Sequence, residues 1–168
     1  MTYTIAHGSS AEAGRLREIE RAAGKLFRDI GMDGIADADP TPATILEDRA
    51  LNGQLLVARK ASGEAVGFLI WSPKDAHAYI EEVSVRPDHA GHKLAARMID
   101  CLCDGIRGRF ARVSLATFRD VPWNAPYYAK LGFTECDRAQ LGPDHDESWR
   151  RQSEHLDMSR RLFMTRQV

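Results

Sequence analysis

Short segments of alternating apolar and polar residues run through the chain, separated by stretches in which apolar residues recur every three or four positions. Alternation predicts strands with one buried face, and the wider spacing predicts helices with an apolar stripe. We therefore expect strands over residues 2–7, 54–60, 64–72, 77–85, 112–118, from Phe133 onward and over 161–166, with a turn over 73–76.

The predicted helices have recognisable starts and ends. Ser9 and Glu12 form a Ser-x-x-Glu capping box before a first helix that runs to Gly31. Residues 34–42 are small, acidic and proline-bearing, which indicates a loop, and Thr41 or Thr44 is expected to cap a second helix that ends after Leu51. Further helices are expected from the Gly91 loop to about residue 105, from Asn124, as its N-cap, to Gly132, and around 148–155.

The stretch 79–96 predicts an anion-binding site. Its strand ends at Pro87, a short loop with Gly91 follows, and a helix then begins whose apolar face carries Leu94, Met98, Leu102 and Ile106. The first turn of a helix has backbone N–H groups without partners inside the helix and a partial positive charge. Small loop residues let an anion approach those groups, so this arrangement favours phosphate.

Two segments carry a family resemblance. Val-x-Pro-x-x-x-Gly-x-x-x-Ala, from Val85 to Ala95, resembles the acetyl-CoA loop of the GNAT N-acetyltransferase superfamily, and Asn-Ala-Pro-Tyr-Tyr-Ala-Lys-Leu-Gly-Phe, over 124–133, resembles the late helix of that family. The resemblance implies a single α/β (α+β) domain over residues 1–168, with a mixed, mostly antiparallel sheet of about seven strands and helices on both faces. It also implies that acetyl-CoA is the acetyl donor, with direct transfer to an amine in a ternary complex.

The same resemblance implies a set of cofactor-binding residues: Val83, Ser84, Val85, Ala90, Gly91, His92, Lys93, Leu94, Ala95, Ala96, Asn124 and Tyr128. The chain departs from the family at Ala90, where Arg or Gln is usual, and at Lys93, where Gly is usual. Two interpretations of Lys93 are open: its Cβ obstructs the pyrophosphate, or its ammonium adds a positive charge beside the phosphates.

Acetyl transfer also needs a neutral amine, because an alkyl ammonium with a pKa of about 10.4 is almost wholly protonated at pH 7. Glu81 and Glu82 lie on the strand that the resemblance places beside the acyl group, so one of them is expected to assist deprotonation, with Glu82 favoured. Glu20, on the first helix, is expected to bind the amine. Each of the three carboxylates has the alternative of an ordinary exposed acid.

Tyr128 stands four residues before Gly132 and matches the tyrosine of the family pattern, which implies a general acid for the leaving thiolate. Tyr127 is expected to pack instead. The acceptor pocket is expected to include Phe27, Trp71, Phe118 and Trp123, although aromatic residues at strand ends are also common core residues.

Composition narrows the partners. The chain has 168 residues, a net charge of −1 and three cysteines without metal-ligand spacing. These features argue against a nucleic-acid-binding protein and a metal site, and no apolar run is long enough to span a membrane. Without a signal-peptide pattern, the expected location is the cytoplasm. The expected acceptor is a small primary amine. The alternatives are a peptide or protein amine, a longer acyl donor and a non-catalytic acyl-CoA-binding module, and a homodimer is common in the family.

Overall fold

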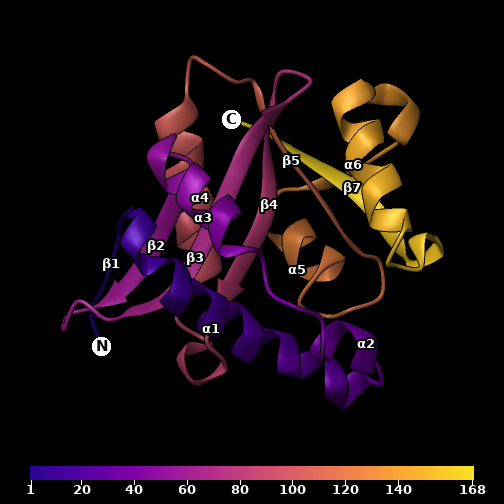
Figure 1. The fold of residues 1–168 in the computed structure, drawn as a ribbon. Coiled ribbons are helices and arrows are strands. Elements are labelled where there is room, and N and C mark those ends of the chain that lie inside the picture. The colour runs from indigo at the N-terminus through magenta and orange to yellow at the C-terminus, as the bar shows by residue number, and fades with distance from the viewer. The chain divides into compact units, whose positions relative to one another are not determined.

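The computed structural model describes all residues 1–168. The strands are β1 (Tyr3–His7), β2 (Leu55–Lys60), β3 (Ala65–Lys74), β4 (His77–Val85), β5 (Arg112–Phe118), β6 (Thr134–Cys136) and β7 (Arg161–Gln167). The α-helices are α1 (Ala13–Gly24), α2 (Asp33–Ala36), α3 (Ala43–Leu51), α4 (Leu94–Ile106), α5 (Ala125–Lys130) and α6 (Pro143–Ser153). All seven predicted strands are present (Figure 1).

The strands form one sheet in the order β1-β2-β3-β4-β5-β7-β6. β4 pairs with β5 in parallel, whereas β1 with β2, β2 with β3, β5 with β7 and β6 with β7 are antiparallel. The predicted mixed, mostly antiparallel sheet is therefore confirmed. The chain divides into two compact units. The first unit contains residues 1–71 and 82–102, and the second contains residues 72–81 and 103–168.

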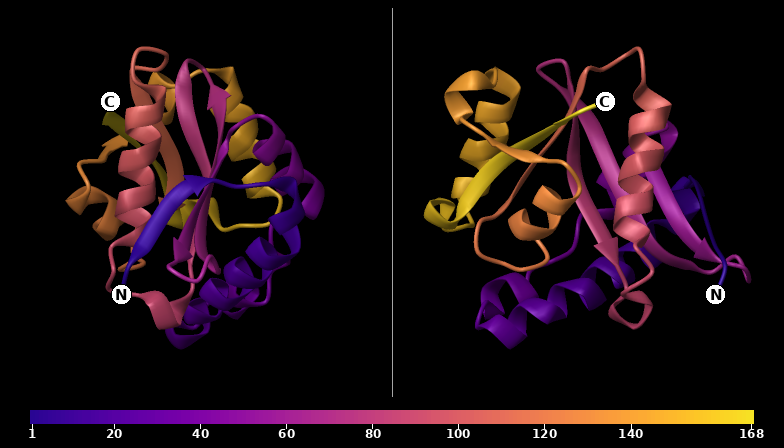
Figure 2. Two further views of the ribbon diagram at one scale, coloured as in Figure 1. Left: turned by 90° about the vertical axis from the view of Figure 1, so that its left-hand side faces the viewer. Right: turned by 180° about the vertical axis from the view of Figure 1, so that it is seen from behind.

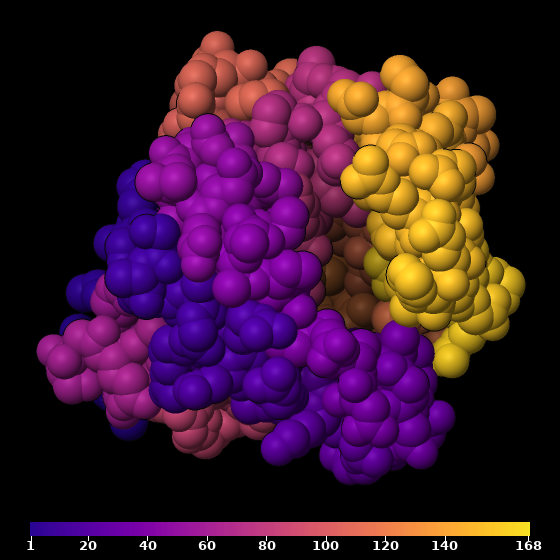
Figure 3. All heavy atoms as spheres, viewed as in Figure 1, coloured from indigo at the N-terminus to yellow at the C-terminus, as the bar shows by residue number.

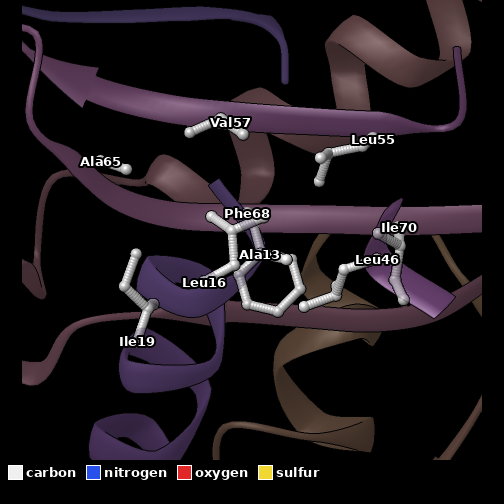
Figure 4. Packing of buried hydrophobic residues seen from close by; sticks show 9 residues of the cluster. All are labelled: Ala13, Leu16, Ile19, Leu46, Leu55, Val57, Ala65, Phe68 and Ile70. Atoms are coloured by element: carbon white, nitrogen blue, oxygen red, sulfur yellow. The ribbon is translucent and has the colours of Figure 1, made fainter. Parts of the chain in front are cut away.

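In the first unit, helices cover both faces of β1, β2 and β3 (Figure 2). One face packs against α1 and α3 through a buried cluster, drawn in Figure 4, that contains Ala13, Leu16, Ile19, Leu46, Leu55, Val57, Ala65, Phe68 and Ile70. α4 lies on the other face, where Met98 lies close to Gly67, at which there is no side chain. This close packing explains the glycine, because a Cβ at Gly67 would lie only 3.1 Å from the carbonyl oxygen of Ser84.

The first helical region begins and ends where the sequence predicts. The Ser9–Glu12 capping box is present, and the region ends at Gly31, whose φ of 75° is left-handed. Between these points the helix is not uniform, since α1 gives way to a 3₁₀ segment at Lys25–Ile30. In the space-filling view of Figure 3 this region lies at the surface in indigo and purple. Leu26 and Ile30, in the 3₁₀ segment, are exposed.

Two local predictions in this unit are wrong. The first residues of the expected loop 34–42 belong to a short helix, α2 (Asp33–Ala36), because the chain turns again directly after Gly31. Neither Thr41 nor Thr44 caps α3, which begins after Pro42 without a side-chain cap. The side chain of Thr41 is engaged elsewhere, as described for the candidate site.

In the second unit, α5 and α6 lie on opposite faces of the strands. α6 packs on the face that carries Ser114 and Phe163. Thr117, three positions after Ser114 on β5, lies on the opposite face and contacts Asn124 at the start of α5. α6 begins at Pro143, earlier than the predicted stretch 148–155. β3 continues through Pro73 to Lys74, so the predicted four-residue turn is reduced to Asp75 and Ala76.

Both turn residues have left-handed backbone, with φ of 45° at Asp75 and 63° at Ala76. The carboxylate of Asp75 accepts hydrogen bonds from the backbone N–H groups of Asp144 (3.1 Å) and His145 (2.8 Å), at the start of α6. It also accepts one from Nδ1 of His145 at 2.7 Å. The turn thus caps a helix about 70 residues away in sequence, which explains why local sequence misplaced the start of α6.

No helix in the structure combines the length and the apolar character that crossing a membrane requires. No group of three or more His, Cys, Asp or Glu side chains is arranged to hold a metal ion.

Candidate active site

The loop between β4 and α4 lies wholly in the first unit. After β4 the chain makes a 3₁₀ turn over Pro87–His89, and two of its residues then have left-handed backbone, Gly91 with φ of 83° and Lys93 with φ of 56°. α4 begins directly afterwards at Leu94. Lys93 therefore keeps the conformation for which a glycine is the usual residue, and we infer that the substitution costs backbone strain rather than a change of loop shape.

This loop fits a diphosphate group. A Cβ placed on Gly91 would meet no protein atom within 4 Å, so the space above the loop is open. Gly91, His92 and Lys93 are exposed, and Leu94 begins a helix whose first amides point toward the loop. Small residues, open space and a helix start are the elements that anion binding requires.

Two carboxylates of the first unit act on each other. Burial, together with the nearby charge of Glu82, raises the pKa of Glu20 to about 7. Glu20 is on α1 and Glu82 on β4, where Oε1 of Glu82 accepts a hydrogen bond from Oγ of Ser84 at 2.7 Å. These are the two side chains that the sequence predicts for amine binding and deprotonation, and the negative charge of Glu82 is one cause of the raised pKa of Glu20.

Thr41 belongs to this group, and sequence reasoning missed it. Its backbone N–H donates to both carboxylate oxygens of Glu20 at 3.0 Å, and its Oγ1 donates to Oε1 at 3.1 Å. These bonds fix the Glu20 side chain on α1. Twenty-one residues separate the pair, so no spacing rule could have found it.

Asn124 and Tyr128 are in the second unit. Asn124 stands at the start of α5 but makes no side-chain cap there, which corrects that prediction. Its Oδ1 instead accepts hydrogen bonds from Oγ1 of Thr117 at 2.8 Å and from the backbone N–H of Phe118 at 3.3 Å. Asn124 thus connects α5 to the end of β5, because its side-chain oxygen accepts hydrogen bonds from two residues of that strand.

The ring of Tyr128 is half-buried and packs edge-on against Phe133, with ring centroids 5.7 Å apart. Its carbonyl oxygen accepts the N–H of Phe133 at 3.1 Å, across the left-handed Gly132. The Tyr-x-x-x-Gly-Phe pattern therefore encodes a helix end that fixes the orientation of the tyrosine. Tyr127 contacts Tyr128 ring to ring at 5.7 Å.

The remaining candidates divide between the two units. Val83 and Val85 are half-buried on β4 beside the buried Ser84, and Phe27 is half-buried in the 3₁₀ segment. Trp71 and Phe118 are each 5% exposed, and the guanidinium of Arg161 lies 4.6 Å from the ring centre of Phe118. Trp123 is half-buried. Glu81, the other candidate base, belongs to the second unit, and its charge contributes to the raised pKa of Tyr79, whose main cause is burial.

Comparison with known proteins bears directly on these geometries. Residues 19–133 match the model of the acetyltransferase (GNAT) family. This range begins within α1, contains the whole loop before α4, and ends at Phe133, the last residue of the α5 pattern.

Solved structures share the fold over the whole chain. The PaiA N-acetyltransferase of Thermoplasma acidophilum, in complex with coenzyme A, is 16% identical with a TM-score of 0.73, and the match covers 100% of both chains. A GNAT-family acetyltransferase of Staphylococcus aureus Mu50 is 14% identical with a TM-score of 0.74, covering 99% of both chains. The ribosomal-protein-S18-alanine N-acetyltransferase of Escherichia coli is 16% identical with a TM-score of 0.65, covering 99% of this chain and 94% of that one.

The family match spans more than half of the chain, and the fold agrees with it in both units. The strand-loop-helix segment that fits a diphosphate is consistent with the coenzyme that the Thermoplasma protein binds. The chain belongs to the GNAT acetyltransferase family and is an acetyl-CoA-dependent acyltransferase.

Proposed function

We propose that the protein moves the acetyl group of acetyl-CoA to the primary amine of a small molecule, by direct transfer while both substrates are bound. The observation that carries this proposal is the carboxylate of Glu20, which Thr41 holds by hydrogen bonds from its backbone N–H and its hydroxyl. Burial and the nearby charge of Glu82 raise its pKa to about 7. A cationic amine beside these two carboxylates would remove the repulsion between them. The site is thus suited to an acceptor that arrives as an ammonium ion.

Each residue then has a defined task. The loop over 90–96 binds the pyrophosphate through backbone N–H groups, and the N–H groups around Val83 and Val85 face the acyl oxygen. Glu20 holds the amine, and Glu82 takes its proton directly or through a water molecule. Tyr128 holds a proton at Oη for the leaving sulfur. Acetyl-CoA, when bound, supplies the acetyl group as an activated thioester.

The test of the acceptor assignment is a screen of amines by thiol release, in which small amines and polyamines are compared with peptides bearing a free N-terminus or a lysine. We expect small amines to be used best. A clear preference for peptides would replace the small-molecule acceptor with a peptide or protein amine. Binding of acetyl-CoA in calorimetry without turnover of any amine would indicate a non-catalytic acyl-CoA module.

The role of Glu82 is tested by the pH profile of Glu82→Gln. Because the base matters most when the amine is protonated, kcat should fall at least about tenfold at pH 7 and recover toward the parent value at pH 10. Parallel profiles for variant and parent would contradict the assignment. Glu81→Gln is the matched control from the adjacent position and should change the profile less.

The raised pKa of Glu20 is tested by stability. The pKa of Glu20 is raised in the folded protein, so the folded state binds the proton more tightly and the parent loses stability as pH rises from about 4.5 to 7. Glu20→Gln removes this dependence and should gain on the order of 1–3 kcal/mol over the parent between pH 5 and 8, measured by urea unfolding. A difference in stability between variant and parent that does not change with pH would contradict the raised pKa of Glu20.

A further inference from the structure

Tyr3 lies on β1, far in sequence from the loop before α4, and yet contacts that loop on both sides of Gly91. Its side chain is 6% exposed. Its Oη lies 2.8 Å from Nδ1 of His89 and donates to Sδ of Met1 at 2.9 Å. Because the hydroxyl proton of Tyr3 is used in the bond to Met1, the Nδ1–H of His89 donates to the hydroxyl oxygen of Tyr3.

The ring of Tyr3 makes further contacts with the same segment. It meets the imidazole of His89 edge-on at 5.8 Å and that of His92 at 5.0 Å between ring centres. The backbone carbonyl of Tyr3 accepts a hydrogen bond from Arg97, in the first turns of α4, at 2.9 Å. One residue therefore contacts the 3₁₀ turn before Gly91, the exposed part of the loop and the helix after it.

The partner histidine is not a free surface group. His89 is 7% exposed, and the 3₁₀ turn that carries it is closed by its own N–H, which donates to the carbonyl of Arg86 at 2.9 Å. β1 is itself fixed by its pairing with β2, in which Tyr3 lies opposite Lys60. Tyr3 is thus a rigid support for this loop, anchored in the sheet.

The loop needs such a support because of Lys93. A non-glycine residue in left-handed conformation is strained and persists only where neighbouring structure holds it. Lys93 lies between His92 and Arg97 in the sequence, and both of these residues contact Tyr3. Contacts on both sides oppose relaxation of Lys93 to an ordinary backbone conformation, which would turn the loop amides away from a bound anion.

We propose that Tyr3 is a positioning residue for acetyl-CoA: through His89, His92 and Arg97 it holds the loop before α4 in the conformation that receives the pyrophosphate. This proposal rests on the proposed binding of the pyrophosphate by residues 90–96. Tyr3 does not touch the reacting atoms. Its contribution is the order it gives the loop before the coenzyme arrives, which reduces the entropy lost on binding.

The experiment measures acetyl-CoA affinity by calorimetry in Tyr3→Phe, which keeps the ring and removes the hydroxyl. One hydrogen bond is worth about 0.5–1.5 kcal/mol, so Kd should rise about two- to tenfold. The KM for acetyl-CoA should rise by the same factor while kcat stays at the parent value. Without ligand, hydrogen exchange at the amides of residues 91–95 should be faster than in the parent.

His89 provides an independent variant in case Tyr3→Phe folds poorly. His89→Ala should reproduce the loss of affinity, and His89→Asn, whose amide can replace Nδ1 as a partner of the Tyr3 hydroxyl, should recover part of it. Tyr79→Phe is the matched control: its buried hydroxyl accepts hydrogen bonds from Ser148 and Gln152 in the other unit. It should leave affinity and exchange at residues 91–95 unchanged.

Gly91→Val separates the two levels of the proposal. If Gly91→Val weakens binding while Tyr3→Phe and His89→Ala bind like the parent, the positioning role is wrong and the pyrophosphate loop stands. If Gly91→Val also binds like the parent, the loop assignment falls and the role of Tyr3 falls with it. Weakened binding in all three, with recovery in His89→Asn, supports the proposal.

Discussion

The protein holds residues other than glycine in left-handed backbone at two places, and the two are stabilised differently. In the turn between β3 and β4, Asp75 and Ala76 are held by the carboxylate of Asp75 itself, which binds the start of α6. In the loop before α4, Lys93 is held by contacts of its neighbours with Tyr3. The first is locked into the structure, while the second lies at the proposed coenzyme site.

The difference lies in what surrounds each place. The partner of Asp75, His145, is fully buried and donates to Asp75 at one ring nitrogen and contacts Oγ of the buried Ser114 at the other, at 2.8 Å. His92 and Lys93 are exposed. Hydrogen bonds to buried partners can hold strain for stability alone, whereas strain held in a loop with exposed residues leaves its amides available to a ligand. The following predictions test that contrast.

The largest effect is expected at Asp75. Asp75→Ala leaves the imidazole of His145 and two α6 amides without their acceptor, so the free energy of unfolding should fall by about 3 kcal/mol in urea denaturation. Asp75→Asn keeps one acceptor oxygen and should lose roughly half as much. Unchanged stability in Asp75→Ala would mean that the network does not hold the turn.

The same residue predicts a pH dependence. Burial alone would raise the pKa of Asp75, but hydrogen bonds from the side chain and backbone of His145 and the backbone of Asp144 outweigh it, and the pKa is lowered. Its stabilisation is therefore complete above the unfolded pKa of about 3.9 and is lost as pH falls through the lower folded value. The difference in the free energy of unfolding between the parent and Asp75→Asn, measured by urea denaturation, should become smaller at acid pH.

Gly142→Ala should give the next largest loss. A Cβ there would lie 2.4 Å from Oδ1 and 2.5 Å from Cγ of Asp75, although its φ of −100° suits any residue. Overpacking of this kind costs about 1–3 kcal/mol. Gly105→Ala is the control, because a Cβ in that α4 position meets nothing within 4 Å and should be neutral or stabilising.

Ala76→Gly tests the strain itself. Since Ala76 has a φ of 63°, glycine should stabilise the fold by about 0.5–1 kcal/mol, seen as a rise in the urea midpoint without a change of slope. The hydrogen bonds of Asp75 to the start of α6 oppose relaxation of this turn. The full gain in stability should therefore appear. A loss of stability would show that the turn carries no strain that glycine can remove.

The smallest stability effect is expected from Lys93→Gly, about 0.5 kcal/mol or less, because the greater freedom of glycine in the unfolded chain offsets most of the backbone strain that it removes from the folded loop. Its acetyl-CoA affinity separates the two interpretations of this residue. If Lys93 contributes charge, affinity falls and depends less on salt. If its Cβ obstructs the pyrophosphate, affinity rises.

Local sequence was enough for much of the fold. The Ser9–Glu12 box, the left-handed Gly31 and the strand-proline-glycine-helix order around Pro87 and Gly91 each act within a few residues, and each was predicted correctly. The same holds for the Tyr128–Gly132 pattern. These features are determined by backbone preference and short hydrogen bonds, which spacing along the chain can reveal.

Features set by distant partners could not be predicted. Thr41 was expected to cap a helix but binds Glu20, and α6 starts early because Asp75 caps it. His89 is buried because Tyr3 contacts it across 86 positions. For the candidate site, the sequence predicted the conformation of the loop before α4 and proposed residue types, whereas the groups that hold these residues in place are seen only in the structure.

The capping of α6 by Asp75 also has a consequence for the order of folding. α6 lies in the chain between β6 and β7, which pair with each other, but its first turn is closed by a residue about 70 positions earlier. The carboxylate of Asp75 can bind the first turn of α6 only after the β3–β4 turn and α6 have come together, which closes a long chain loop. Closing such a loop is slow compared with local helix formation. The first turn of α6 should therefore become protected from hydrogen exchange late in refolding, together with the β3–β4 turn rather than with β6.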